Sequence, residues 1–186
     1  MISVSLKRIF EQSAPKALFL RAGIVGLNFV VMVCIAAYLG FSEFGRLAFL
    51  WGGALMASTV LSLGGPLILL KRLTDGGGLR TWDLFGYCVL YPLLVAVSVL
   101  GPLTWAFPSV AWEAVLFGGV AINLVFCLAS VMRALGSVQM SMALRDAGPQ
   151  IALGSAVFVV GHQGAALTLF ASACLMCGLG VIGVIW

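Results

Sequence analysis

The sequence predicts an all-α protein, a polytopic transmembrane helix bundle of about six spans. Three observations support this prediction: 62% of the 186 residues are hydrophobic, 9% are charged, and apolar stretches of membrane-spanning length recur along the chain. Soluble domains carry roughly 25% charged residues, so this chain lacks the side chains that would cover a water-facing surface. Its mean hydropathy of +1.17 agrees. These values exclude a soluble enzyme, a disordered chain and a secreted disulfide scaffold.

Six apolar stretches are the predicted membrane spans, since a helix needs about 20 mostly apolar residues to cross the hydrocarbon. The stretch 147–161 is too short by itself, and we expect it to cross only if its helix begins near Val138 and is kinked at Pro149. Arg145 and Asp146 would then lie at the water boundary. The six stretches are 17–40, 47–70, 84–107, 115–132, 147–161 and 165–186.

Small residues and prolines within the spans predict a closely packed and bent bundle. Ala54, Ser58 and Ser62 recur every four residues, which lets a neighbouring backbone come close. Pro66, which follows two glycines, and Pro92 are expected to mark kinks or unwound turns. Lipid tolerates such breaks only where they pack against protein or line a cavity.

Residues 1–16 are expected to form a cytoplasmic helix that lies in the membrane interface. Ile2, Leu6 and Phe10 share one face at helical spacing, and the charged residues lie on the other. The apolar stretch that follows is longer than the core of a cleaved signal peptide, so we expect it to remain as the first span.

The distribution of lysine and arginine predicts a cytoplasmic N-terminus. Arg46 is expected on one side of the membrane and the other nine on the opposite side, and such an excess marks the cytoplasmic face. The basic residues form short runs rather than one solvated face, so no nucleic-acid partner is expected. The side of the C-terminus depends on whether the fifth stretch crosses. The nine residues are Lys7, Arg8, Lys16, Arg21, Lys71, Arg72, Arg80, Arg133 and Arg145.

Polar side chains inside the apolar stretches are the candidate binding residues, because lipid makes them costly unless they face the bundle interior. Arg21 and Asn28 are seven residues apart and share a helix face. They form either a cationic site for an anionic headgroup such as pyrophosphate, or a boundary at which Arg21 reaches back to the cytoplasmic surface. Asn123, Tyr87 and Tyr91 either line a hydrated groove or, in the case of Asn123, join two helices through a hydrogen bond.

No group of residues predicts catalysis or metal binding. All six acidic residues fall in loops or near the ends of predicted helices, which argues against a carboxylate pair in the membrane. The five cysteines lie in apolar runs, so we interpret even the CxxC at Cys174 and Cys177 as packed thiols rather than a redox pair. We therefore expect a protein that is not an enzyme and holds neither a cofactor nor a metal.

Three segments resemble one protein family. The segment AAYLGFSEFGRLAFL, with Leu39, Gly40, Glu43, Phe44 and Gly45, is similar to the junction of the first two helices of oligosaccharide flippases. LSLGGPLILLKR resembles the glycine-rich end of that family's second helix, and RALGSVQMSMALRDAGPQ resembles its basic linker between the fourth and fifth helices. These proteins, also called polysaccharide biosynthesis proteins, belong to the multidrug/oligosaccharidyl-lipid/polysaccharide exporter superfamily. The resemblance covers best the first third of the chain.

The resemblance implies a function and a location. Family members have two lobes of helices around a central cavity and move an undecaprenyl-pyrophosphate-linked oligosaccharide from the cytoplasmic to the outer leaflet of the bacterial inner membrane. This chain resembles the N-terminal lobe, so we expect the second lobe to come from the rest of a longer chain, a second copy or another membrane protein. Arg21 falls at the position of the first-helix cation that holds the pyrophosphate, and Arg46 and Arg72 are further candidates.

Two other functions stay open. The chain could be a non-transporting subunit or scaffold of a polysaccharide assembly, in which case the face formed by Ala54, Ser58 and Ser62 is needed while Arg21 and Asn28 are dispensable. It could also be a small-molecule exporter of the same superfamily. Membrane lipids are expected partners under all three hypotheses.

Overall fold

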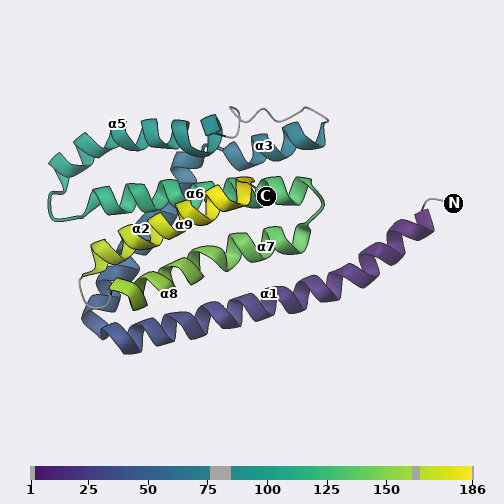
Figure 1. The fold of residues 1–186 in the computed structure, drawn as a ribbon, viewed down its shortest axis with the longest axis horizontal. Coiled ribbons are helices and arrows are strands. Elements are labelled where there is room, and N and C mark those ends of the chain that lie inside the picture. Colours follow the sequence, from purple (N-terminus) through teal and green to yellow (C-terminus); the bar gives the residue numbers. More distant parts are fainter. Residues whose placement is uncertain (1–2, 76–84, 161–163, 186) are drawn as a thin grey trace.

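The computed structural model confirms the all-helical prediction over the residues that it describes (Figure 1). It describes the backbone of residues 3–75, 85–160 and 164–185, and the side chains of 18–75, 85–160, 164–169 and 171–177. The side chains of residues 1–16, whose placement at the interface was predicted, lie outside this range, as does Arg80. The elements are α1 (Ser3–Leu39), α2 (Phe41–Ser62), α3 (Gly65–Thr74), the π-helical turn η1 (Gly86–Leu90), α5 (Tyr91–Ala106), α6 (Trp112–Ala134), α7 (Val138–Asp146), α8 (Gly148–Val160) and α9 (Ala165–Ile185).

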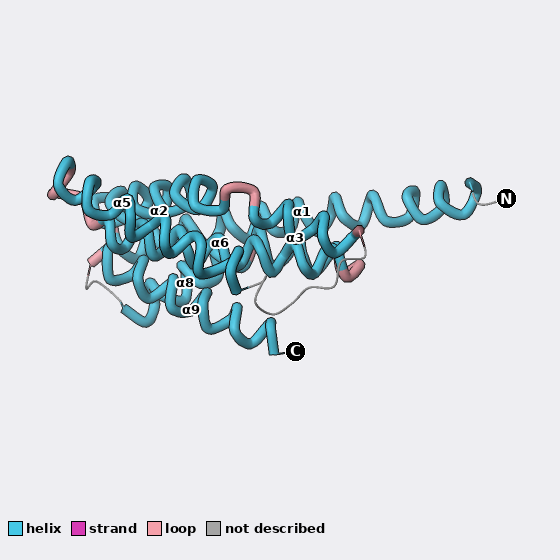
Figure 2. Tube along the Cα trace, turned by 90° about the horizontal axis from the view of Figure 1, so that it is seen from above, coloured by secondary structure: helices cyan, strands magenta, loops and turns pink. Residues whose placement is uncertain are grey.

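The central element of the bundle is α6, which packs against α2, α3, α5, α7 and α9. Seen from above, it lies between α5 and α9 (Figure 2). Of the most apolar stretch of α6, 67% is buried, against 11% for α1. The main core contains residues of α2, α6, α8 and α9, among them Leu47, Ala54, Ile122, Leu153 and Leu169. The outer face of α1 is therefore left uncovered by the described residues.

Small residues bring α2 and α6 into close contact, as the spacing of Ala54 and Ser58 predicted. A Cβ atom added at Gly119 would lie 2.9 Å from the Cβ of Ala57 and 3.1 Å from the backbone nitrogen of Ser58. Real Cβ atoms do not approach that closely, so α2 can pack here only against glycine. Ala54 and Ser58 are fully buried in this contact.

We expect Gly119→Ala to destabilise the protein by about 1–3 kcal/mol, the usual cost of overpacking. The free energy of unfolding in detergent would measure this loss. Gly26→Ala is the matched control, because a Cβ at Gly26 meets nothing within 4 Å and alanine is the better helix former. Equal stability of the two variants would contradict the close contact.

The structure corrects the boundaries of the second predicted span. The helix begins at Phe41 rather than Leu47 and ends at Ser62 rather than Leu70. Leu63 and Gly64 have positive φ angles of 39° and 81°, which end α2 in a left-handed turn, and α3 continues with Pro66 in its first turn. The unwound turn predicted near Pro66 is confirmed. Pro92 follows the π-helical turn η1, so the third span is also irregular where a kink was predicted.

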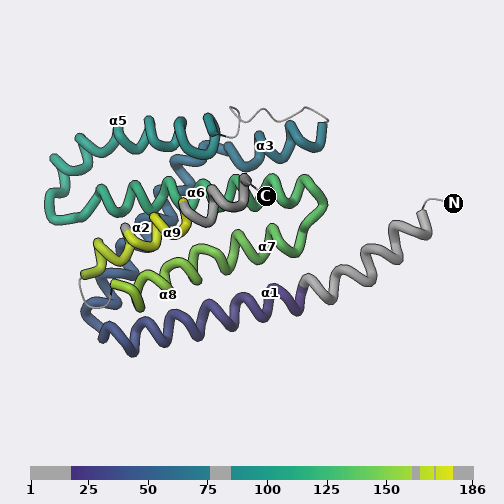
Figure 3. Tube along the Cα trace, viewed as in Figure 1, coloured from purple at the N-terminus to yellow at the C-terminus, as the bar shows by residue number. Residues whose placement is uncertain are grey.

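The fifth stretch forms two helices that run back along α6 (Figures 1 and 3). As predicted, helix begins at Val138, but the interruption falls at Ala147, between α7 and α8, and not at Pro149 itself. At the other end of the chain, α1 is continuous from Ser3 to Leu39. Residues 3–16 therefore belong to the same helix as the first span and do not form a separate one.

Four of the described helices are long and apolar enough to cross a membrane. They are Leu18–Leu39, Phe41–Ser62, Gly86–Ala106 and Trp112–Ala134. Gly148–Val160 and Ala165–Cys177 are apolar but shorter. The chain is thus a helical bundle with the composition and helix lengths of a multi-pass membrane protein.

Candidate functional site

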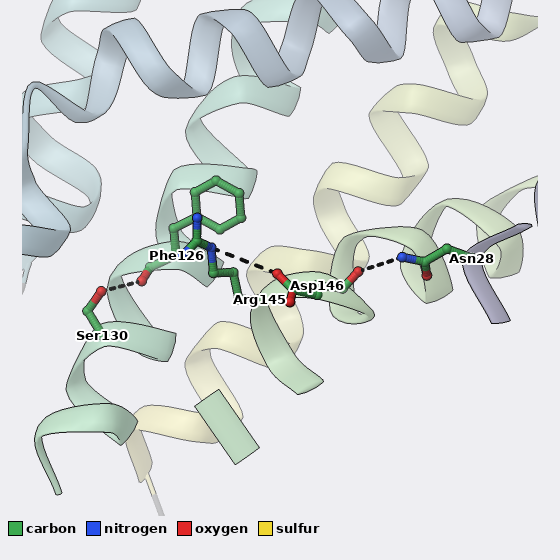
Figure 4. A network of polar contacts seen from close by, with 5 residues as sticks. All are labelled: Asn28, Phe126, Ser130, Arg145 and Asp146. Carbon is green, nitrogen blue, oxygen red and sulfur yellow. Dashed lines mark hydrogen bonds and ion pairs between the residues drawn. The ribbon is translucent and has the colours of Figure 1, made fainter. Parts of the chain in front are cut away.

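Polar side chains from α1 and α7 meet beside α6, where α7 gives way to α8 (Figure 4). Nδ2 of Asn28 donates a hydrogen bond to the backbone carbonyl of Asp146 at 3.0 Å. Nε of Arg145 lies 3.9 Å from Oδ1 of Asp146, and the guanidinium carbon of Arg145 lies 5.5 Å from the centre of the Phe126 ring. We call Asn28, Arg145 and Asp146 the polar junction.

The break between α7 and α8 explains why Asn28 is needed there. The last carbonyls of a helix have no partner within it, and the carbonyl of Asp146, the last residue of α7, is one of them. Pro149 has no N–H to donate to the carbonyl of Arg145, four residues before it. The amide of Asn28 supplies a donor to the Asp146 carbonyl instead. The regular pattern resumes where Ile151 N–H bonds to the carbonyl of Ala147 at 2.9 Å.

The polar junction lies inside the length of the bundle rather than at its end. Arg145 packs over Phe126, which precedes the end of α6 at Ala134 by two turns, or about 12 Å along the helix axis. The side chains of Arg145 and Asp146 are 54% and 38% exposed, so both charges remain accessible. Both residues lie in the last turn of α7, and their predicted place at the water boundary stays a prediction.

Two buried amide oxygens, one on α1 and one on α8, have no hydrogen-bond partner among the described atoms. They are Oδ1 of Asn28 and Oε1 of Gln150. Gln150 lies one turn before Gly154, where a Cβ would approach Val31 of α1 to 3.2 Å, and one turn after Asp146. The polar junction thus offers an accessible guanidinium and carboxylate, with the unpartnered oxygen of Asn28 buried beside them.

The remaining predicted site residues fall at separate places. Arg21 is exposed on α1, two turns before Asn28. Arg72 stacks over the Tyr87 ring, with its guanidinium carbon 5.8 Å from the ring centre, and so joins α3 to η1. Tyr91 is 45% exposed.

Asn123 joins two helices. It is fully buried, and its Nδ2 donates to the carbonyl of Cys88 in η1 at 3.3 Å. Sγ of Cys127 lies 3.9 Å from Oδ1 of Asn123, within hydrogen-bond distance. Of the two interpretations of Asn123, this geometry supports the interhelical bond.

Arg46 lies near the start of α2, close to the turn at Gly40. Its Nη1 is 3.7 Å from Oε1 of Glu43, and its side chain is 75% exposed. Together with Ser42, Ser109 and Leu167 it lines an open cavity of about 650 Å³. Arg46 and Arg72 are therefore far apart along the chain of helices, at the beginning of α2 and near the end of α3.

Comparison of the chain with protein-family models, with curated proteins and with solved structures finds no match. Within the described residues, no three histidine, cysteine or acidic side chains come together as metal ligands would. Any function must therefore be argued from the geometry.

Replacement of Asn123 by alanine should cost about 0.6 kcal/mol of stability, the average for a hydrogen bond between membrane helices. It should leave substrate affinity unchanged, because a fully buried amide presents no atom to a ligand. The control is Ser98→Ala, since Ser98 is exposed and bonds to Leu94 of its own helix at 2.8 Å. An Asn123→Ala protein of normal stability but weakened binding would instead support the hydrated groove.

Proposed function

We propose that this chain is the N-terminal half of a membrane translocator, which moves a lipid-linked oligosaccharide with a pyrophosphate headgroup from the cytoplasmic to the outer leaflet by alternating access. The observation that carries the proposal is the polar junction at the interrupted helix. Charged side chains at membrane depth are costly and mark substrate pathways. Interrupted helices in membranes line cavities or pack against protein, and transporters place their binding sites at such helices.

The cation of the junction, with Arg21 two turns away on α1, fits an anionic headgroup. The planar guanidinium of Arg145 can make two parallel hydrogen bonds to a phosphate, and Asp146 holds it in the absence of substrate. Arg21 lies two turns from Asn28 along α1 and supplies a second cation for the same path. The uncovered face of α1 offers a surface on which a second lobe can complete the cavity.

The proposal includes six membrane crossings. α7 and α8 together match α6 in length and lie beside it (Figure 3), which supports a fifth crossing in two pieces. α9 returns along the bundle as the sixth. The excess of basic residues on one side supports a cytoplasmic N-terminus, and the proposed substrate corresponds to a location in a bacterial plasma membrane.

Cysteine labelling tests this topology. In a variant whose five cysteines are replaced by alanine, single cysteines are introduced as Ser109→Cys, Ser137→Cys and Ala165→Cys and treated with a membrane-impermeant maleimide from one side. We expect Ser109→Cys and Ala165→Cys to be labelled from the same side and Ser137→Cys from the other. Labelling of Ala165→Cys together with Ser137→Cys would mean that α7 and α8 do not cross.

Transport is tested with the protein expressed from its complete gene and reconstituted into liposomes with a fluorescent polyprenyl pyrophosphate. Arg145→Gln and Arg21→Ala should lower the rate of flipping about tenfold or more, since a hydrogen bond to a charged group contributes roughly 1.5–3 kcal/mol. Arg133→Gln, which removes an exposed arginine from the last turn of α6, is the control.

A double variant separates substrate binding from packing. In Arg145→Gln the carboxylate of Asp146 loses its partner, whereas Arg145→Gln with Asp146→Asn removes both charges. If arginine binds the headgroup, the double variant stays inactive. If it recovers, or if Arg21→Ala flips normally at normal protein level, the role in transport is wrong. If polysaccharide export requires the face formed by Ala54, Ser58 and Ser62 but neither arginine, the scaffold hypothesis is favoured. If deletion of the gene changes drug tolerance instead of polysaccharide export, a small-molecule exporter is favoured.

A further inference from the structure

We propose that the face formed by α2, α5 and α6 binds a membrane phospholipid, with its phosphate at Arg46 and one acyl chain in an adjoining apolar groove. The inference rests on the proposed function in one respect, the insertion of the bundle in a bilayer. It does not require transport, and it concerns neither the polar junction nor Arg21.

The groove has a volume of about 580 Å³ and an apolar lining. Met56 and Val60 of α2 and Val99 of α5 are 75%, 63% and 40% exposed there, so the groove opens outward from the bundle. Its floor includes Gly52 and Gly53, which have no side chains to fill it. The other lining residues are Ala48, Phe49, Ala57, Leu61, Val95, Leu103, Val110, Trp112, Val115 and Leu116.

The groove is continuous with the cavity beside Arg46. Phe49 and Val110 line both. The cavity adds the hydroxyl groups of Ser42 and Ser109 and the guanidinium of Arg46. The cavity, which is lined by a cation and two hydroxyl groups, therefore leads directly into the apolar groove. A phospholipid has the matching arrangement, with a charged phosphate attached to apolar acyl chains.

The length of the groove fits one acyl chain. From Ala48 to Leu61 the helix rises about 20 Å, and one leaflet contributes about half of a hydrocarbon core roughly 30 Å thick. The cavity lies near the start of α2, in the turns around Ser109 and Gly164, where a headgroup at the membrane surface would sit. A chain entering at Phe49 would run toward the bilayer centre along α2.

The guanidinium of Arg46 is the group in the cavity that can bind a phosphate. Among the described residues that line the cavity, Arg46 is the one with a charge, and guanidinium groups match phosphate geometry. Its partner Glu43, at 3.7 Å, competes for the same guanidinium.

Native mass spectrometry of the detergent-solubilised full chain tests the inference. The probes are phosphatidylglycerol and a diacylglycerol with the same acyl chains, which lacks the phosphate. We expect phosphatidylglycerol to be retained about fivefold better, the effect of roughly one basic residue on binding to an anionic surface. Arg46→Gln should abolish this preference, and Glu43→Gln should increase it because the guanidinium is released.

A second pair of variants tests the groove itself. Gly52→Leu places a side chain in the groove, where a Cβ meets nothing within 4 Å, so the protein should fold and should lose both lipids. Gly26→Leu, at an equally unobstructed helical glycine of α1, should retain them, and Arg133→Gln is the charge control. Unchanged preference in Arg46→Gln, or unchanged retention in Gly52→Leu, would overturn the inference.

Two further results separate this inference from its alternatives and from the proposed function. If Gly52→Leu converts a dimer to a monomer without changing lipid retention, the groove holds a second copy of the chain and the inference is wrong. Alternatively, Arg46→Gln loses the preference for phosphatidylglycerol and Gly52→Leu loses both lipids, as expected, while the unaltered protein flips no polyprenyl pyrophosphate. In that case the lipid site is supported and the proposed transport function is wrong.

Discussion

The approach of α2 to α6 sets the distances in the rest of the bundle. Lipid tails are as apolar as the helices, so helices associate in a membrane through close packing and hydrogen bonds rather than through the hydrophobic effect. At Gly119 the backbone of α6 lies against Ala57 and Ser58. At Gly118 an added Cβ would approach Ala54 of α2 to 3.2 Å and Leu169 of α9 to 3.4 Å. Two consecutive glycines thus position α6 against two neighbours at once.

Polar contacts then join the more distant elements to this packed centre. Asn123 ties α6 to η1, Arg72 ties α3 to the same turn, and Asn28 ties α1 to α7. Each uses a backbone carbonyl or an aromatic ring exposed by an irregularity in a helix. The interruptions that weaken individual helices are therefore the points at which helices are linked.

Local features of the fold, such as turns and helix breaks, could be predicted from the sequence. The residues at which the long helices begin and end could not. Glycines before Pro66 predict an unwound turn because glycine alone adopts positive φ easily, and the turn is present at Gly64. The weak fifth stretch indicated helix from Val138. The beginning of α2 at Phe41 was missed, because the prediction followed runs of apolar residues. Ser42, Glu43 and Arg46 are polar and interrupt such a run, although they belong to the helix.

The candidate site was harder to predict than the fold. A polar residue in an apolar run is visible in sequence, which is why Asn28 and Asn123 were selected. Their partners are carbonyls of residues 118 and 35 positions away, and backbone carbonyls carry no sequence signal. Arg145 and Asp146 were predicted at the water boundary and not as binding residues, and Gln150 was not selected. The sequence did contain a signal for this site. The charged pair is followed, after one alanine, by Gly148 and Pro149, and glycine with proline is a combination that interrupts helices.

The π-helical turn also fixes how the third span is rotated about its own axis. It accommodates one residue more than an α-helical turn, so Phe85, just before it, is turned by about 100° about the helix axis relative to its place in a regular helix. Tyr87, inside this turn, meets Arg72, while Tyr91, one turn later, faces outward. Removal of a single residue between Gly86 and Leu90 would restore regular winding and turn Phe85 by about 100° relative to α5. The number of residues between Gly86 and Leu90 therefore matters to the structure as well as their identity.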